Sequence, residues 1–189
     1  DVDFSGSRCE LLNVDDFGIL FEEDFEAYAN FDQISGNWTN YIEEGSRDWI
    51  ARTTTDTGNP GSRIAQISAY NSGDASTVSW LITPQIDLDA QEFEFFDFES
   101  SNSFSDGSEL ELLISTDWDG TDASVSSATW TSLPGTIVPD ATYYKDWIYS
   151  GLVDLSPYSG NAHIAFKYTA NSGNTGTYEI DNVKVLVQN

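Results

Sequence analysis

Carboxylates are the side chains of this sequence with the clearest chemical potential. Glu22, Asp24 and Glu26 alternate along one short run, so in a strand they would share a face. Phe21 and Phe25 would then lie on the opposite face. Because like charges stacked along one face repel each other, that face needs water or a cation.

A further carboxylate lies near the other end of the chain. Asp181 stands inside Tyr178–Val187, an apolar run that we interpret as a strand, where a charge is costly unless it is compensated. Ca²⁺ takes about six to eight oxygen ligands, which carboxylates and backbone carbonyls supply. We therefore hypothesise that the first and last strands meet and share a structural Ca²⁺. Its anionic ligands would be Asp24, Glu26 and Asp181.

Two alternatives to this ligand set remain open. Glu23 and Asn182 could substitute for one of the three ligands, and the acidic face could simply be a solvated edge. A second acidic loop, with Asp117, Asp119 and Asp122, has the alternation of a Ca²⁺ loop. It lacks the distal Glu of a complete one, and an ordinary Asx-type turn explains it equally well.

Aromatic side chains in polar loops are candidates for ligand contact, because flat aromatic faces bind the apolar C–H patches of sugars. Trp118 lies in a polar loop, where an exposed indole needs a reason. Trp49, Tyr144 and Trp147 have intermediate surroundings. We predict that at least one of these loop aromatics contacts a ligand and take these four residues as the candidates, the alternative being packing at the sandwich edge. The tryptophans in strand-like contexts are expected in the core: Trp38, Trp80 and Trp130.

Catalytic constellations are poorly supported by the residue types present. His163 is the single histidine and Cys9 the single cysteine, so neither a Ser-His-Asp nor a Cys-His arrangement can be argued, and zinc lacks ligands. Paired carboxylates for glycoside hydrolysis cannot be singled out among 32 acidic residues. We expect no enzyme; a hydrolase would require a deep cleft with two carboxylates.

Composition limits the class of protein and its partners. A length of 189 residues with 39% hydrophobic content suits one domain with a sizeable core. The net charge of −25 argues against nucleic acid and anionic membrane surfaces, and favours divalent cations. No apolar run is long enough to span a membrane. Because methionine is absent even at position 1, we expect the chain to be part of a longer protein.

The elements that must position these residues read as strands. Short runs with a period of two recur along the chain, for example Arg63–Tyr70 and Glu109–Ser115. Pro84 interrupts Thr77–Leu88, which predicts a strand, a bend and a second short strand. No helical period exceeds one turn, so we predict an all-β antiparallel sandwich of about ten strands. The domain would span 17–189, with 1–16 as a linker or the tail of an upstream domain.

Several segments in order carry a family resemblance. They are Glu22–Glu26, Gly36–Trp38, Trp80–Leu88, Ser115–Thr121, Trp130–Leu133, Asp154–Ser156 and Ile180–Val183. Their order and spacing resemble the choice-of-anchor J and cleaved-adhesin jelly-roll domains of bacterial surface and secreted proteins. The opening and closing strands are also similar to those of MAM domains.

The resemblance implies a two-sheet antiparallel jelly-roll β-sandwich with structural Ca²⁺ where the first and last strands meet. Carried over by position, it points to Glu26 with Asp24, and to Asp181. The family has no shared catalytic residue. We therefore expect a non-catalytic carbohydrate-binding module of a bacterial surface glycan-binding protein. It would be monomeric, extracellular or at the cell surface, and bound to a polysaccharide. The alternative is a protein–protein adhesion or spacer domain without a sugar site.

Overall fold

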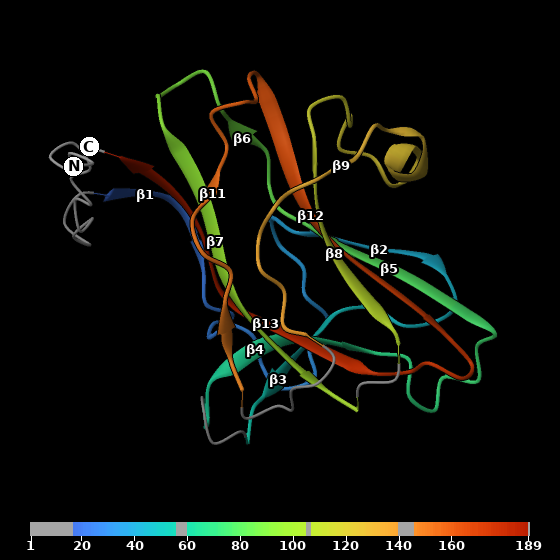
Figure 1. The fold of residues 1–189 in the computed structure, drawn as a ribbon. Helices are drawn as coiled ribbons and strands as arrows, with labels where there is room; N and C mark the ends of the chain where they lie inside the picture. The colour runs from blue at the N-terminus through green and yellow to red at the C-terminus, as the bar shows by residue number, and fades with distance from the viewer. Residues whose placement is uncertain (1–16, 56–59, 105–106, 140–145, 189) are drawn as a thin grey trace, which may run out of the picture.

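Two antiparallel β-sheets face each other in the computed structural model, which describes residues 17–55, 60–104, 107–139 and 146–188 (Figure 1). The predicted all-β two-sheet sandwich is confirmed. The segment 1–16, predicted as a linker or tail, lies outside the described residues. No helix in the described part of the chain has the length and apolar character needed to cross a bilayer.

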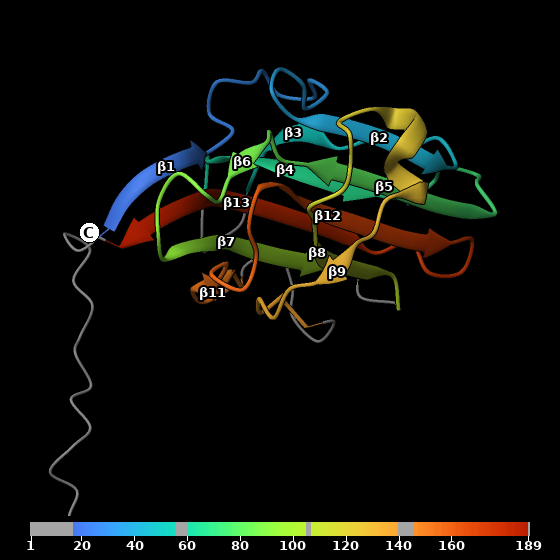
Figure 2. The same cartoon turned by 90° about the horizontal axis from the view of Figure 1, so that it is seen from above.

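The seven-stranded sheet has the order β10-β7-β13-β4-β3, with β1 paired to β13 and β11 paired to β7. Its strands are β1 (Phe17–Glu23), β3 (Ile50–Thr53), β4 (Arg63–Ser68), β7 (Glu94–Ser103), β10 (Ile148–Tyr149), β11 (Val153–Asp154) and β13 (Thr177–Gln188). The first and last strands therefore lie side by side, as both views of the ribbon show (Figure 2).

The six-stranded sheet has the order β2-β5-β12-β8-β9, with β6 paired to β12. Its strands are β2 (Thr39–Glu44), β5 (Ser76–Ile82), β6 (Ile86–Asp87), β8 (Glu109–Ser115), β9 (Thr131–Ser132) and β12 (Asn161–Asn171). The predicted break at Pro84 is confirmed, since β5 ends before it and β6 begins after it. Proline cannot donate to a sheet ladder, so the chain bends there.

The main core fills the space between the sheets. Phe96 and Phe98 from the seven-stranded sheet meet Phe166 from the six-stranded sheet, and all three are fully buried. The rings of Phe98 and Phe166 pack edge to face with centroids 4.9 Å apart. Side chains that alternate outward along the same strands are left to form the two external faces.

The strand predicted over the first acidic run ends earlier than expected. β1 stops at Glu23, and Phe25 has a left-handed backbone (φ 55°) with its ring fully buried. Glu23 Oε1 accepts the N–H of Phe25 at 2.8 Å, and Asp24 Oδ1 accepts the N–H of Glu26 at 3.1 Å. These carboxylates take the donors that a continuing strand would offer its neighbour, so the chain turns inward.

β13 contains a bulge that changes which side chains face outward. Its register with β7 shifts between Asp181 and Lys184, and Asn182 there has a φ of 51°. Ile180 before the bulge and Val183 after it both belong to the core, although they are three residues apart. The extra residue resets the two-residue alternation. Asp181 thus keeps the outward direction although it is only 1% exposed.

A second, smaller core covers the outer face of the six-stranded sheet. The 3₁₀ helix η2 (Asp122–Ser127) and the chain around it pack on that face. Trp130 packs between the other two tryptophans there, with its ring centroid 5.2 Å from that of Trp80 and 6.0 Å from that of Trp118. The sequence predicted only a polar loop here, because a single short turn of helix leaves no periodic pattern.

Candidate functional site

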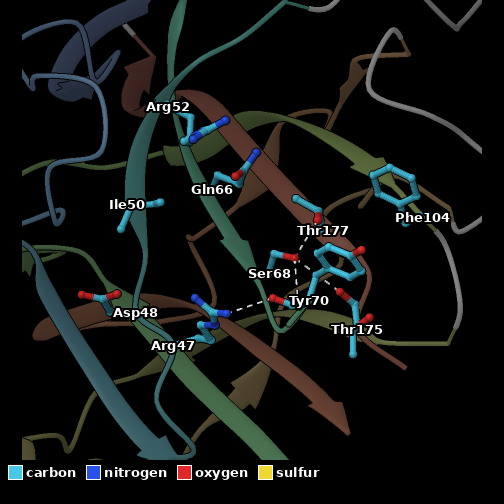
Figure 3. Close-up of a pocket in the computed structure, with 10 residues that line it drawn as sticks. All are labelled: Arg47, Asp48, Ile50, Arg52, Gln66, Ser68, Tyr70, Phe104, Thr175 and Thr177. Atoms are coloured by element: carbon cyan, nitrogen blue, oxygen red, sulfur yellow. Dashed lines mark hydrogen bonds between the residues drawn. The ribbon is translucent and has the colours of Figure 1, made fainter. Parts of the chain in front are cut away.

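A large hollow of the described surface lies on the outer face of the seven-stranded sheet. Its volume is about 690 Å³, a size typical of ligand sites in proteins. Gln66 and Ser68 of β4 and Thr177 of β13 lie across its middle (Figure 3). The side chains that bound it come from β3 and the residues before it on one side, and from the residue after β7 on the other.

Two exposed aromatic rings flank this hollow. Tyr70 follows β4 and is 66% exposed, and Phe104 follows β7 and is 70% exposed. Large aromatic groups left this open beside polar side chains mark interaction sites more often than structural ones. Their faces could stack on the C–H faces of sugar rings.

A hydrogen-bond network holds the hollow's central side chains. The Thr177 hydroxyl donates to Ser68 Oγ at 2.8 Å, and the Gln66 amide donates to Glu179 Oε1 at 2.7 Å. Ser68 Oγ also accepts the N–H of Tyr70 at 3.3 Å. Hydroxyls fixed in this way offer positioned partners to a ligand without first having to be ordered.

Two arginines line the hollow on the β3 side, opposite Phe104 (Figure 3). Arg47 donates from Nη2 to the carbonyl of Tyr70 at 2.9 Å. The guanidinium of Arg52 lies over the exposed ring of Phe31, 4.2 Å from its centroid. Asp48, between them in sequence, is the one carboxylate among the lining residues.

A smaller hollow adjoins the first across Tyr70 and Thr175, which line both. Its far wall includes Asp74, which accepts the N–H and the hydroxyl of Ser46, each at 2.9 Å. The hydroxyl contact is the main cause that holds the pKa of Asp74 below its ordinary value, and Arg47 adds a smaller share. Asp74 is therefore an ionised acceptor at neutral pH. Together the two hollows suit an extended ligand that passes over Tyr70.

The aromatic residues predicted to contact a ligand lie elsewhere. Trp49 is fully buried in the main core and Trp118 is 7% exposed in the smaller one, so both predictions are wrong. Trp118 donates from Nε1 to the Thr121 carbonyl at 3.0 Å and packs edge to face on His163. An indole with its N–H satisfied inside a folded loop needs no exposed role.

The structure describes only one of the other two predicted aromatic residues. Trp147 is half-buried and does not line either hollow. Tyr144 lies outside the described residues. The residues expected in the core are buried in the case of Trp38 and Trp80, and half-buried in the case of Trp130.

Two of the three predicted calcium ligands converge. The hydroxyl of Ser62 lies 3.1 Å from Glu26 Oε1 and 3.1 Å from Asp181 Oδ2. A hydroxyl has one hydrogen and can satisfy only one carboxylate at a time. Glu26 Oε1 also accepts the N–H of Arg63 at 2.8 Å, and Asp181 Oδ1 accepts that of Asn182. Two anionic oxygens at one hydroxyl make an oxygen-rich group of the kind that a hard cation takes.

Asp24 does not join this pair. Its carboxylate caps the turn through the N–H of Glu26. Within the described ranges, no three side chains of the His, Cys, Asp and Glu types come together closely enough to hold a metal. The predicted set is thus reduced to Glu26 and Asp181, and any further ligands would be backbone carbonyls, Ser62 or water.

The sequence contained signals for the residues that were missed. Phe104 is a lone aromatic in the polar run 101–107, the same kind of signal that pointed to Trp118. Arg47 and Arg52 lie close together in a chain with only seven basic residues. Neither signal says which loop folds back over a sheet and which stays open, because that choice is made by tertiary packing.

Comparison with known proteins identifies the fold and no family. No family model matches the sequence, and no curated protein is significantly similar to it. Among solved structures, the K1 cleaved adhesin domain of Lys-gingipain from Porphyromonas gingivalis is similar, with a TM-score of 0.59 and 15% identity. The match covers 89% of this chain and 98% of that domain. The predicted likeness to cleaved-adhesin sandwiches is confirmed as a likeness of fold, and the choice-of-anchor J assignment stays a prediction.

Carbohydrate-binding modules are also among the structural neighbours. A xylan-binding domain from CBM 22 has a TM-score of 0.51 and 14% identity, covering 90% of this chain and 96% of its own. TmCBM61 in complex with β-1,4-galactotriose has a TM-score of 0.50 and 12% identity, covering 78% and 86%. At such identities these neighbours share the jelly-roll fold with this chain, and its ligand has to be argued from its own surface.

Proposed function

We propose that this chain is a non-catalytic carbohydrate-binding module of an extracellular or cell-surface protein, and that it binds a polysaccharide in the hollow beside Tyr70. The observation that carries the proposal is the pairing of two open aromatic rings, Tyr70 and Phe104, with positioned hydroxyl and amide groups between them. Stacking faces together with fixed polar partners are what sugar rings require. Xylan-binding and galactotriose-bound modules among the structural neighbours support it.

Affinity electrophoresis of the whole chain through a panel of soluble polysaccharides tests this proposal. We expect retardation by at least one polymer, and at least a tenfold loss of affinity in Tyr70→Ala and in Phe104→Ala. Phe93→Ala is the matched control, because Phe93 is 56% exposed beside the opposite end of β7. Retardation by no polymer, or equal losses in all three variants, would count against a sugar site in this hollow.

A protein–protein adhesion or spacer domain is the second candidate. Similarity to the cleaved adhesin domains of Lys-gingipain favours it. Burial of four tryptophans favours it as well, because the sheet faces then carry few large aromatic surfaces on which a sugar could stack. The four buried tryptophans are Trp38, Trp49, Trp80 and Trp118. Absence of retardation by any polysaccharide, in a protein whose thermal unfolding is cooperative, would make this candidate the better one.

We further propose a structural Ca²⁺ held by Glu26 and Asp181 where the turn after β1 meets β13. The convergence of both carboxylates on the Ser62 hydroxyl supports it. Such an ion would offset the cost of keeping the Asp181 carboxylate almost wholly out of water. Isothermal titration of CaCl₂ into chelator-treated protein should show one saturable site; absence of binding heat at millimolar Ca²⁺ would remove the proposal.

A further inference from the structure

The basic side chains of this acidic chain are not equally neutralised. Five of its seven basic residues are described, and both lysines among them lie beside glutamates. Lys167 Nζ is 3.8 Å from Glu111, and Lys184 Nζ is 3.6 Å from Glu22. By contrast, no carboxylate of the described residues is within ion-pairing distance of Arg47 or Arg52. Both of these arginines line the hollow.

The two guanidinium groups are held in place, and most of their donors have no partner among the described residues. A guanidinium carries five N–H donors, and within the part of the chain that the structure describes Arg47 commits only Nη2, to the Tyr70 carbonyl. Its Nε is shielded from water and has no hydrogen-bond partner. Arg52 is positioned by stacking on Phe31, which occupies the face of the guanidinium and leaves its N–H edge available.

The rest of the lining does not neutralise these charges. Asp48 is the one acidic residue there, and it forms no ion pair with either arginine. The lining thus carries a net charge of +1 (two arginines less one aspartate), on a chain whose net charge is −25. Arginine forks match carboxylate and sulfate groups geometrically, and such charge-assisted bonds are stronger than neutral ones.

We infer that the ligand of this hollow is an acidic polysaccharide, whose carboxylate or sulfate groups are bound by Arg47 and Arg52 while its ring faces stack on Tyr70 and Phe104. This inference rests on the proposed carbohydrate-binding function and specifies its ligand class. Such polymers carry about one charge per sugar or fewer, against one per roughly 1.7 Å along duplex DNA. The chain's overall repulsion of nucleic acid therefore does not forbid one sparse acidic group at a local basic site.

Biolayer interferometry in 0.15 M NaCl without added calcium, on immobilised polymers, tests the inference with the whole chain. Three arms are compared. Alginate, hyaluronan and polygalacturonate carry carboxylates, carrageenan carries sulfates, and methyl-esterified galacturonan, agarose and galactan are neutral. The esterified and free galacturonans share one backbone, as carrageenan and agarose nearly do, so these pairs isolate the acidic group.

We expect binding to at least one acidic polymer, with at least a tenfold weaker response to its neutral counterpart. Arg52→Gln should weaken that binding at least tenfold, and Arg52→Lys should restore part of it. Arg47→Gln should act in the same direction. Lys184→Gln changes the net charge equally but lies outside the hollow, so it should bind as the parent chain does.

The outcomes separate this inference from the function on which it rests. Binding to neutral polymers that Tyr70→Ala abolishes and Arg52→Gln leaves intact would overturn the acidic ligand and keep the sugar site. Equal losses in Arg52→Gln and Lys184→Gln would also overturn it, because net charge alone would then explain the effect. Binding to no polymer in any arm would overturn both.

Discussion

Asp97 is a carboxyl group held largely out of water on the seven-stranded sheet. Burial raises its pKa above the ordinary 3.8, although the Tyr149 hydroxyl, donating to Oδ2 at 2.9 Å, and the nearby Lys184 act in the opposite direction. Burial and the bond to Asp97 raise the pKa of Tyr149 in turn, so its hydroxyl remains the donor. The folded chain therefore retains the Asp97 proton to a higher pH than the unfolded chain does.

This raised pKa predicts a stability effect with a definite sign. Between the ordinary and the raised pKa the folded state binds more protons than the unfolded state does. The contribution of Asp97 to the free energy of unfolding therefore falls as pH rises through that window. Asp97→Asn cannot ionise and still accepts the Tyr149 hydrogen bond. We expect its melting temperature to exceed the parent's by a few degrees at pH 7 and to equal it at pH 3. A lower melting temperature at pH 7 would show that the charge itself is stabilising.

Trp118 is the residue whose predicted role the structure reverses, from ligand contact to packing. Because it is buried against His163 and closes the smaller core, Trp118→Ala should cost about 3–5 kcal/mol of unfolding free energy. Trp118→Phe keeps a ring on His163 but loses the bond to Thr121 and part of the indole volume, so it should cost less than Trp118→Ala. Denaturant unfolding measures both.

A binding measurement completes this test. Trp118→Phe, once shown to be folded, should bind any polysaccharide ligand as the parent chain does, since Trp118 lines neither hollow beside Tyr70. A variant of full stability that loses affinity would return Trp118 to the list of ligand contacts.

At the scale of elements, strands were predictable where one face is buried and the other open. Period-two runs located β4 and β8, and Pro84 located the break before β6, because each depends on local backbone chemistry. The end of β1 was predicted too late, because the capping of the Phe25 and Glu26 N–H groups by Glu23 and Asp24 depends on the chain turning inward.

The site was less predictable than the strands because it is assembled from distant segments. Glu26, Ser62 and Asp181 meet only after β1, β4 and β13 are placed side by side. The carboxylates suggested that the first and last strands meet, but no pattern in the sequence pointed to Ser62. Tyr70 and Phe104 become one surface only because β4, β13 and β7 are neighbours. Residue types in the sequence suggested candidates for the site, and the order of the strands in the sheet determined which of them lie together.

The meeting of β1 and β13 predicts a calcium effect that matched variants can resolve. We expect Ca²⁺ at about a hundred times its dissociation constant to stabilise the fold by about 2.7 kcal/mol, measured by thermal unfolding with and without chelator. Glu26→Gln and Asp181→Asn should abolish that increment. Asp24→Asn removes the same charge from a neighbouring position outside the pair, so this variant should retain most of the stabilisation by Ca²⁺. An equal loss in all three would make the effect one of net charge.

At the scale of the whole molecule, charge is the dominant long-range force. Each of the few lysines described is paired, and the excess of 25 negative charges is spread over a small sandwich. Mutual repulsion of these carboxylates disfavours the compact state, because unfolding moves them apart. The Debye length falls from about 30 Å at 0.01 M salt to about 8 Å at 0.15 M, so much of this repulsion should be screened over that range.

We therefore expect the melting temperature to rise by several degrees between 0.01 M and 0.15 M NaCl at pH 7, measured in chelator so that bound calcium does not contribute. KCl should act equally, because screening depends on ionic strength and not on the identity of the cation. At such low concentrations salt effects on hydrophobic burial are small, so screening is the term being measured. A melting temperature that is flat or falls with salt would mean that the carboxylates are stabilised by local partners strongly enough to outweigh their mutual repulsion.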